Sequence, residues 1–576
     1  MQTRIQIIGL GFLLVFLAIG VRLFYWQIVR GKELSSQAKV QYESGETISA
    51  PRGNILASDS TWLVASGEAW LLFAYLPDID DPPKEIADKL APFFVVREDE
   101  ESDSEYREKL LNEVDRLYSL LKKDEVVWVA LKRKLLPETK KNIEALSISG
   151  IGFEPGERRV YPEASSAAHL LGFVGKNKEG EDTGYFGLEG FYDLSLSGKP
   201  GFLKRESDAK GTPILFGGSY EISAVGGTDL KTYIDKSIQL TIEEQLVDGI
   251  EKYGAKEGSV VVMNPKNGAI LGMASYPSYD PEQYSEYGDE YFKNPVVSSS
   301  FEPGSVFKVL VMSAALDADV VEPDTRCEIC EGPLRVDKYI IRTWNNEYRP
   351  DSTMLDVIVN SDNVGMVYVG QTLGADKLYD YLDNFGIGKL TGVDLQGEAT
   401  PRLRPKDKWS IVDVSTASFG QGIAVTPIQM IKAVSAIANK GVLVTPQVVD
   451  SLQGRGWAED IKPEFGERVI SEETAKVMTS MMVEAAKNGE AKWTHLRGFK
   501  VAGKTGTAQI PVAGNYDSEK TIASFIGFAP ADDPEFLMLV TLRESESSPW
   551  ASETAAPLWY SIANELFLYF GIQPEN

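Results

Sequence analysis

The chain has 576 residues, which is long for a single domain and predicts two or three. Its apolar fraction of 43% fits folded globular domains rather than disordered segments. The net charge of −26 argues against nucleic acid or an anionic lipid surface as a partner.

The first predicted element is a membrane anchor over residues 5–28. This run is apolar and long enough to cross a bilayer as a helix, and Trp26 near its end suits the membrane interface. A cleaved signal peptide is the alternative, because Arg4 precedes the run and a small-residue site ends at Gly20. Since the apolar pattern continues past Gly20, the sequence favours an uncleaved anchor behind a short tail, residues 1–4.

Residues 29–225 are predicted to form a mixed domain of short strands, loops and helices. A strand is expected at 61–65, and apolar spacing typical of a helix runs from 106 to 121. Between 172 and 211 the glycines and lysines favour loops and short strands. The composition changes near Gly226, where a second domain, 226–576, is predicted to begin.

The second domain is predicted to be of the α+β class, with an antiparallel sheet flanked by helices. Its sheet would be assembled from both ends of the domain around a helical middle at about 305–490. The expected elements are a helix at 236–253, a hairpin of strands 259–263 and 269–273, three strands at 500–508, 521–528 and 536–542, and a closing helix at 558–570.

Three short motifs in series carry the chemistry. They are Ser305-Val-Phe-Lys308, Ser361-Asp-Asn363 and Lys504-Thr-Gly506, and each is common by chance when alone. Together and in this order they indicate an acylating serine enzyme that uses lysine where most serine hydrolases use histidine.

The Ser305 motif is predicted to open a helix. Pro303 and Gly304 precede an apolar run in which Lys308 is the one cation, three residues from Ser305 and so on the same face. A buried lysine tends to lose its proton, and a neutral amine can accept the proton of a serine hydroxyl. The alternative is a core helix with an incidental serine and a snorkelling lysine, which the other two motifs make the weaker interpretation.

The histidines and cysteines are not expected to take part in catalysis. His169 is predicted to be structural, and His495 is predicted to be solvated, so a Ser-His-Asp triad is disfavoured. Cys327 and Cys330 lack the further ligands that a zinc site needs, which leaves a local disulfide or two free thiols. No metal or cofactor is expected.

The motifs and their surroundings resemble the class B penicillin-binding proteins, which are membrane-anchored peptidoglycan transpeptidases. The resemblance covers nearly the whole chain. It rests on Glu302-Pro-Gly-Ser-Val-Phe-Lys308, Ala502-Gly-Lys-Thr-Gly-Thr507, Phe419-Gly-Gln-Gly422, Arg52-Gly-Asn-Ile55, Arg159-Val-Tyr-Pro162, Ala168-His-Leu-Leu-Gly172 and Gly187-Leu-Glu-Gly190. It implies that 29–225 is a non-catalytic pedestal of the dimerisation type, and that 226–576 is an extracytoplasmic transpeptidase domain. The tail, residues 1–4, would be cytoplasmic.

The resemblance also implies a role for each motif residue. Ser305 would be the acylated nucleophile and Lys308 its general base. Ser361 would relay the proton to the leaving amine, and Asn363 would hold the substrate amide. The third motif would bind substrate through Thr505, Gly506 and Thr507, with both threonines on its carboxylate, while Lys504 supplies positive potential. The N–H groups of Ser305 and Thr507 would form the oxyanion hole.

The expected function is therefore D,D-transpeptidation of peptidoglycan stem peptides, with covalent inhibition by β-lactams. A serine β-lactamase, a β-lactam sensor and a catalytically idle scaffold share the fold, and a bifunctional polymerase would need a glycosyltransferase domain ahead of the pedestal. The sequence disfavours a β-lactamase because it offers no identifiable glutamate for deacylation, and a sensor because it has one membrane span rather than several. It disfavours an idle scaffold because the motifs are intact. It disfavours a bifunctional polymerase because 29–225 holds no candidate acidic pair for glycosyl transfer. The expected partners are stem peptides, β-lactams, a membrane glycan polymerase and other cell-wall synthesis proteins, but not nucleic acid.

Overall fold

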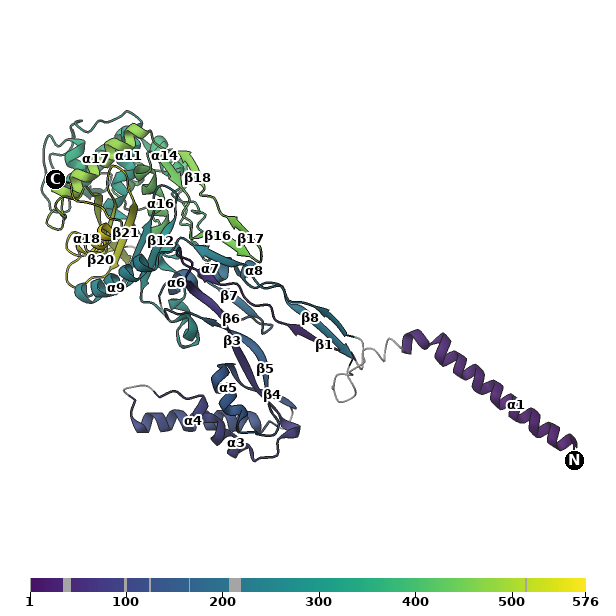
Figure 1. The fold of residues 1–576 in the computed structure, drawn as a ribbon. Coiled ribbons are helices and arrows are strands. Elements are labelled where there is room, and N and C mark those ends of the chain that lie inside the picture. Colours follow the sequence, from purple (N-terminus) through teal and green to yellow (C-terminus); the bar gives the residue numbers. More distant parts are fainter. Residues whose placement is uncertain are drawn as a thin grey trace. The chain divides into compact units, whose positions relative to one another are not determined.

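The computed structural model describes residues 2–34, 43–97, 101–123, 126–164, 166–206, 219–512 and 515–575 (Figure 1). The chain forms two units. One comprises Met1–Arg52 and Ser197–Gly227, and the other comprises Gly53–Leu196 and Thr228–Asn576. The predicted boundary between residues 225 and 226 stays a prediction.

The smaller unit contains the apolar N-terminal helix. Helix α1 spans Gln2–Phe24 and continues as a π-helical turn, Tyr25–Val29, and its apolar side chains are exposed. Within the described residues it is the one helix long and apolar enough to cross a membrane, as expected of a single-pass membrane protein. The guanidinium groups of Arg22 and Arg30 lie over the ring of Trp26, which suits an interfacial aromatic residue. The same unit holds an antiparallel sheet of β1 (Glu43–Ile48), β8 (Gly201–Glu206) and β9 (Ser219–Ile222).

The larger unit begins with a seven-stranded sheet ordered β17-β16-β10-β2-β3-β4, with β5 also paired to β3. Strand β3 runs much further than the predicted 61–65, because β5 pairs along most of its length. The strands are β2 (Ile55–Leu56), β3 (Trp62–Tyr75), β4 (Trp128–Leu135), β5 (Ile151–Val160), β10 (Asp229–Thr232), β16 (Val449–Gly454) and β17 (Trp457–Asp460).

Helices pack at the β3–β5 end of this sheet. The predicted helix at 106–121 is present as α4 (Asp103–Leu121), whose start is fixed by a capping box between Ser102 and Glu105. Helices α3 (Pro83–Leu90) and α5 (Pro137–Glu144) complete a separate small core with it. Short elements follow, as predicted for 172–211: α6 (Ala168–Leu171), β6 (Phe173–Lys176), β7 (Asp182–Tyr185), α7 (Gly187–Phe191) and α8 (Asp193–Leu196).

A buried ion pair joins two of the motifs named above, Arg159-Val-Tyr-Pro162 and Gly187-Leu-Glu-Gly190. Arg159 at the end of β5 donates from Nε to Oε1 of Glu189 in α7 at 2.6 Å. Both side chains are buried, at 6% and 0% exposure. A buried pair of this kind holds its two segments together, since the loss of one partner leaves an uncompensated charge.

The antiparallel sheet predicted from the two ends of the second domain is confirmed. Its order is β12-β11-β21-β20-β19, formed by β11 (Glu257–Met263), β12 (Ile270–Tyr276), β19 (Ala502–Val512), β20 (Asn515–Ala529) and β21 (Phe536–Arg543). Helices α9 (Lys236–Tyr253) and α18 (Ala555–Tyr569), both predicted, share one apolar core with it. Phe525 and Trp559 both belong to that core, with ring centroids 5.0 Å apart.

The middle of the domain is helical, as expected, and contributes most of the largest apolar core of the described residues. Its helices are α10 (Pro295–Ser298), α11 (Lys308–Asp317), α12 (Met354–Val359), α13 (Asn363–Leu373), α14 (Ala375–Asn384), α15 (Ile411–Ala417), α16 (Pro427–Ala438) and α17 (Glu472–Asn488). A small hairpin of β13 (Leu334–Val336) with β14 (Tyr339–Ile341) accompanies them, as does an antiparallel pair of β15 (Val442–Val444) with β18 (Phe465–Arg468). Cys327 and Cys330 form a disulfide, which decides between the alternatives that the sequence left open.

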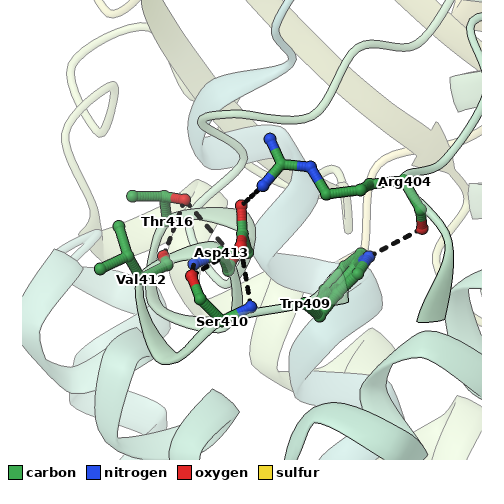
Figure 2. A network of polar contacts seen from close by, with 6 residues as sticks. All are labelled: Arg404, Trp409, Ser410, Val412, Asp413 and Thr416. Carbon is green, nitrogen blue, oxygen red and sulfur yellow. Dashed lines mark hydrogen bonds and ion pairs between the residues drawn. The ribbon is translucent and has the colours of Figure 1, made fainter. Parts of the chain in front are cut away.

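A polar network fixes the start of α15 (Figure 2). Ser410 and Asp413 form a capping box, in which each side chain accepts a hydrogen bond from the other residue's backbone N–H. Arg404 pairs with Asp413, and the indole of Trp409 donates to the carbonyl of Arg404 at 3.0 Å. The network anchors the helix that leads into the Phe419-Gly-Gln-Gly422 loop.

Candidate active site

Ser305 lies in a tight turn in front of a buried helix. The helix predicted to begin near Ser305 starts as a 3-10 turn, Gly304–Phe307, and continues as α11. Gly304 adopts a φ of +56° and donates its N–H to the carbonyl of Gly420 at 3.0 Å. A Cβ on Gly420 would lie 2.1 Å from the Gly304 carbonyl oxygen, so the close approach needs glycine there. The Phe419–Gly422 loop therefore clamps the turn that carries Ser305.

Lys308 is completely buried at the start of α11. Its Nζ donates to the Ser361 carbonyl at 2.6 Å, to Asn363 Oδ1 at 2.8 Å and to Ser361 Oγ at 3.2 Å. Burial, reinforced by the positive charge of Lys504, lowers the pKa of Lys308 to about 7. Among the described residues its hydrogen bonds go to the 361–363 segment and not to Ser305 Oγ. The expected burial of Lys308 is confirmed, and its partners could not be foreseen from the helix alone.

The second motif presents its side chains from the junction between α12 and α13. Ser361 is buried and has a φ of +55°, an uncommon conformation for a residue other than glycine. Asp362 caps α13 by accepting the N–H groups of Val364 and Gly365. Asn363 starts α13, accepts from Lys308 and donates from Nδ2 to the carbonyl of Arg342 at 3.0 Å. The strained turn and the cap together direct Ser361 and Asn363 toward the lysine.

Lys504 reaches Ser361 from β19, on the opposite side. Its Nζ donates to Ser361 Oγ at 3.0 Å and to Thr505 Oγ1 at 3.1 Å. Burial lowers the pKa of Lys504, and the carboxylate of Glu490 opposes that effect. Two lysines more than a hundred residues apart in sequence thus share one hydroxyl oxygen as acceptor.

The rest of the third motif brings β19 against the nucleophile turn. A Cβ on Gly506 would lie 2.8 Å from Ser524 Oγ and 2.9 Å from Val306 Cγ1, so this contact depends on glycine. Thr505 Oγ1 donates to Glu490 Oε2 at 2.9 Å. Thr507 Oγ1 accepts the N–H of Ala551 at 3.0 Å, which leaves its hydroxyl proton free for another acceptor.

These segments enclose a narrow cleft of about 60 Å³. Ser305, Asn363 and Thr507 line it directly, whereas Lys308, Ser361 and Lys504 are buried and joined to one another by hydrogen bonds. The remaining lining residues are Gly304, Trp344, Phe419, Gln421, Glu490 and Trp550. The structure therefore brings all three predicted motifs together around one site.

Four lining residues were not predicted. Trp344 and Trp550 meet edge to face, with centroids 5.4 Å apart, and both stay more than a third exposed. Exposed tryptophans in polar loops are a weak signal that sequence reasoning could have used. Glu490 is a lone acid just beyond α17, and Gln421 lies inside a stretch noted only for its resemblance; neither could be placed without the fold.

Both histidines lie away from the cleft lining. His169 is buried, and its Nε2 lies 2.9 Å from the carbonyl of Tyr291. Burial lowers its pKa to about 4, as expected of a structural residue. His495 was predicted to be solvated, which is wrong. It is half-buried with its ring against Tyr560, because the loop packs on α18, and burial lowers its pKa.

This fold and this constellation define a serine enzyme of the penicillin-recognising class. The sequence model of the penicillin binding protein transpeptidase domain matches residues 258–566, and that of the penicillin-binding protein dimerisation domain matches residues 47–232. The chain belongs to the class B penicillin-binding proteins.

Named relatives and a solved structure agree with this assignment. The chain is 34% identical to stage V sporulation protein D of Bacillus subtilis, over 100% of this chain and 87% of the relative. It is 28% identical to the probable peptidoglycan D,D-transpeptidase PenA of Neisseria meningitidis, over 99% of this chain and 93% of the relative. Penicillin binding protein 3 of Mycobacterium tuberculosis, solved in complex with aztreonam, aligns with a TM-score of 0.69 at 25% identity, covering 92% of this chain and 98% of that one.

Proposed function

We propose that this protein is a peptidoglycan D,D-transpeptidase that joins stem peptides through an acyl-enzyme on Ser305. The observation that carries the proposal is the meeting of Lys308 and Lys504 on Ser361 Oγ, beside a cleft that Ser305 lines. The named transpeptidases among the relatives support the reaction class.

In the acylation step, Ser305 Oγ attacks the carbonyl carbon of the terminal peptide bond in the donor stem peptide. Its proton passes to the neutral amine of Lys308, whose pKa of about 7 leaves much of it unprotonated at neutral pH. Among the described residues the serine and the lysine are not hydrogen-bonded, and catalytic contacts of this kind often tighten only when substrate binds. The developing oxyanion accepts hydrogen bonds from the backbone N–H groups of Ser305 and Thr507.

Collapse of the tetrahedral intermediate breaks the peptide bond and releases the terminal residue as an amine. Ser361 delivers the proton to that amine, because its hydroxyl already bonds both lysines. The amine of an acceptor stem peptide then attacks the ester carbonyl of Ser305. The attacking amine gives up a proton to the neutral Lys308, the new amide forms, and Ser305 Oγ leaves and takes that proton from Lys308, which completes the cross-link.

Substrate recognition falls to the groups around this centre. Asn363, half-exposed in the cleft, holds the substrate amide. Thr505, Gly506 and Thr507 present the edge of β19 to the donor, with the threonine hydroxyls directed to its carboxylate. Lys504 adds positive potential to this end of the cleft. A β-lactam enters the same site and acylates Ser305 in place of the stem peptide.

The setting of the catalytic domain follows from the anchor. We infer that residues 5–28 remain as a single membrane span, with residues 1–4 cytoplasmic and the catalytic domain, 226–576, outside the membrane. The pedestal, 29–225, would then connect the span to the catalytic domain along the chain, with a membrane glycan polymerase and other cell-wall synthesis proteins as partners. Supporting this are the apolar helix α1 and the match to the dimerisation domain over residues 47–232.

Labelling with a tagged penicillin tests the catalytic proposal. The tag should remain on the peptide that contains Ser305, and Ser305→Ala should abolish it. Ser313→Ala is the matched control, since Ser313 lies in α11 but its Oγ bonds only the carbonyl of Val309 among the described residues. Label on a different serine, or label retained by Ser305→Ala, would sink the assignment.

Protease protection tests the topology. The mature protein should keep its original N-terminus and pellet with membranes, and added protease should digest the catalytic domain from outside intact cells or spheroplasts. An N-terminus mapped to Val21 would instead favour the cleaved signal peptide.

A further inference from the structure

Glu490 is an acidic residue that the three catalytic motifs do not include. It follows α17 and lines the same cleft as Ser305 and Thr507. Its Oε2 accepts the hydroxyl proton of Thr505 at 2.9 Å. The carboxylate therefore touches the third motif from the side of the cleft.

A chain of hydrogen bonds connects Glu490 to the base. Thr505 donates to Glu490 and, through the same Oγ1, accepts from Lys504 Nζ at 3.1 Å. Lys504 in turn donates to Ser361 Oγ at 3.0 Å, and Lys308 donates to that same oxygen at 3.2 Å. Glu490 stands at the Lys504 end of this chain, and Lys308 stands at the other.

The reaction requires the two neighbouring lysines to differ in charge. Both are buried and bond one oxygen, so two adjacent positive charges repel each other in a site that water does not screen. A base at Lys308 must be neutral, while substrate carboxylate binding needs the charge at Lys504. Two carboxylates act on this pair. That of Asp362 already accepts two backbone N–H groups at the start of α13, which leaves Glu490 as the carboxylate linked to Lys504.

We propose that Glu490 is a positioning residue that keeps Lys504 protonated over the pH range in which Lys308 acts as the neutral base. The inference rests on the proposed transpeptidase function and extends it to a residue outside the three motifs. Glu490 acts through Thr505 and its charge, without contacting the reacting atoms.

The negative charge of Glu490 determines the direction in which the pKa values of the two lysines should shift when it is removed. Burial lowers the pKa of both lysines, and Glu490 raises both against that effect. Removing its charge lowers both pKa values further. Lys308 then becomes neutral at a lower pH, and Lys504 loses its proton at a lower pH. Because the hydrogen-bond chain joins Glu490 to Lys504, the alkaline limb of the acylation profile should move toward acid further than the acidic limb does, so that the active pH window narrows.

The test is the second-order rate of acylation of Ser305 by penicillin between pH 5 and pH 10, measured on the full chain. In Glu490→Gln, which keeps an oxygen acceptor for Thr505, the alkaline limb should shift to lower pH by about one unit, the scale set by a nearby charge in a partly buried site, and the acidic limb should shift by less. Glu490→Asp should restore most of the native profile. Glu473→Gln, at an exposed position on α17, should leave the profile unchanged.

The outcomes separate the inference from the function on which it rests. An alkaline limb that stays in place in Glu490→Gln, or that moves no further than the acidic limb, would overturn the proposal whatever happens to the plateau rate. A wild-type protein that penicillin does not acylate would instead contradict the proposed function. If Glu490→Gln melts below the assay temperature, Glu490→Thr supplies the neutral variant, with the same expected direction and the same refuting result.

Discussion

Replacing the buried lysine of the first motif is the most direct probe of the mechanism. In Lys308→Arg the positive charge is kept, but a guanidinium does not lose its proton in a protein and cannot serve as a base. It is also larger than the ammonium that now fits against the Ser361 carbonyl and Asn363 Oδ1. We expect acylation by penicillin to fall by about 10²–10⁴-fold, the usual contribution of a positioned general base.

The pH dependence of acylation in the wild-type protein tests the role of Lys308 in a second way. Lys308 has a pKa near 7 in place of 10.5, so about half of it is neutral at pH 7, whereas roughly one in 3000 of an ordinary lysine would be. The neutral form is the active one. Acylation should therefore rise with pH through about 7, and at pH 5 it should be about one hundredth of the plateau.

Stopped-flow measurement of penicillin acylation across this pH range decides the matter. Lys432→Arg is the matched control, because Lys432 is a partly buried lysine of α16 that donates to the carbonyl of Thr391, outside the cleft lining. Near-normal acylation by Lys308→Arg, or a flat wild-type profile between pH 5 and pH 8, would refute the reasoning.

Three further predictions concern stability and turnover. Glu189→Gln should lower the free energy of unfolding by about 3–5 kcal/mol in denaturant titration, because it leaves the buried charge of Arg159 without its carboxylate partner. Glu282→Gln, at an exposed ion pair, should lower that free energy by at most about 1 kcal/mol. Gly420→Ala should greatly reduce penicillin labelling, since its Cβ would meet a carbonyl of the nucleophile turn at 2.1 Å, while Gly386→Ala, with a similar positive φ but open space, should keep it. The penicillin adduct should outlast a catalytic cycle, for which rates are commonly about 1–10³ s⁻¹; steady release of hydrolysed drug in a gel-based decay assay would point to a β-lactamase.

The sequence predicted much of the catalytic domain because its signals are local. The hairpin of β11 and β12 follows from apolar runs around Asn264-Pro-Lys-Asn-Gly268, and α9 and α18 follow from helical spacing. The burial of Lys308 could likewise be predicted, since its neighbours in α11 are apolar on all sides.

The parts that escaped prediction depend on contacts between distant segments. Ser305 lies in a 3-10 turn whose first residue, Gly304, is held by Gly420, more than a hundred residues away, and nothing near Ser305 signals that contact. The place of Glu490 in the cleft depends in the same way on how α17 ends beside β19. Residue type and spacing identified the motifs, but only the packed fold shows which groups share a proton.

The order of strands in the catalytic sheet bears on how the protein is made. Strand β11 lies between β12, its neighbour in sequence, and β21, which begins at Phe536. During synthesis the apolar edge of β11 therefore stays unpaired until β21 has been translated, and an unpaired apolar edge is prone to aggregation. Because Lys504 also arrives with these late strands, a truncated or nascent chain lacks the second lysine as well as three of the five strands. The ability to react with penicillin should therefore appear only after β21 (Phe536–Arg543) has been translated.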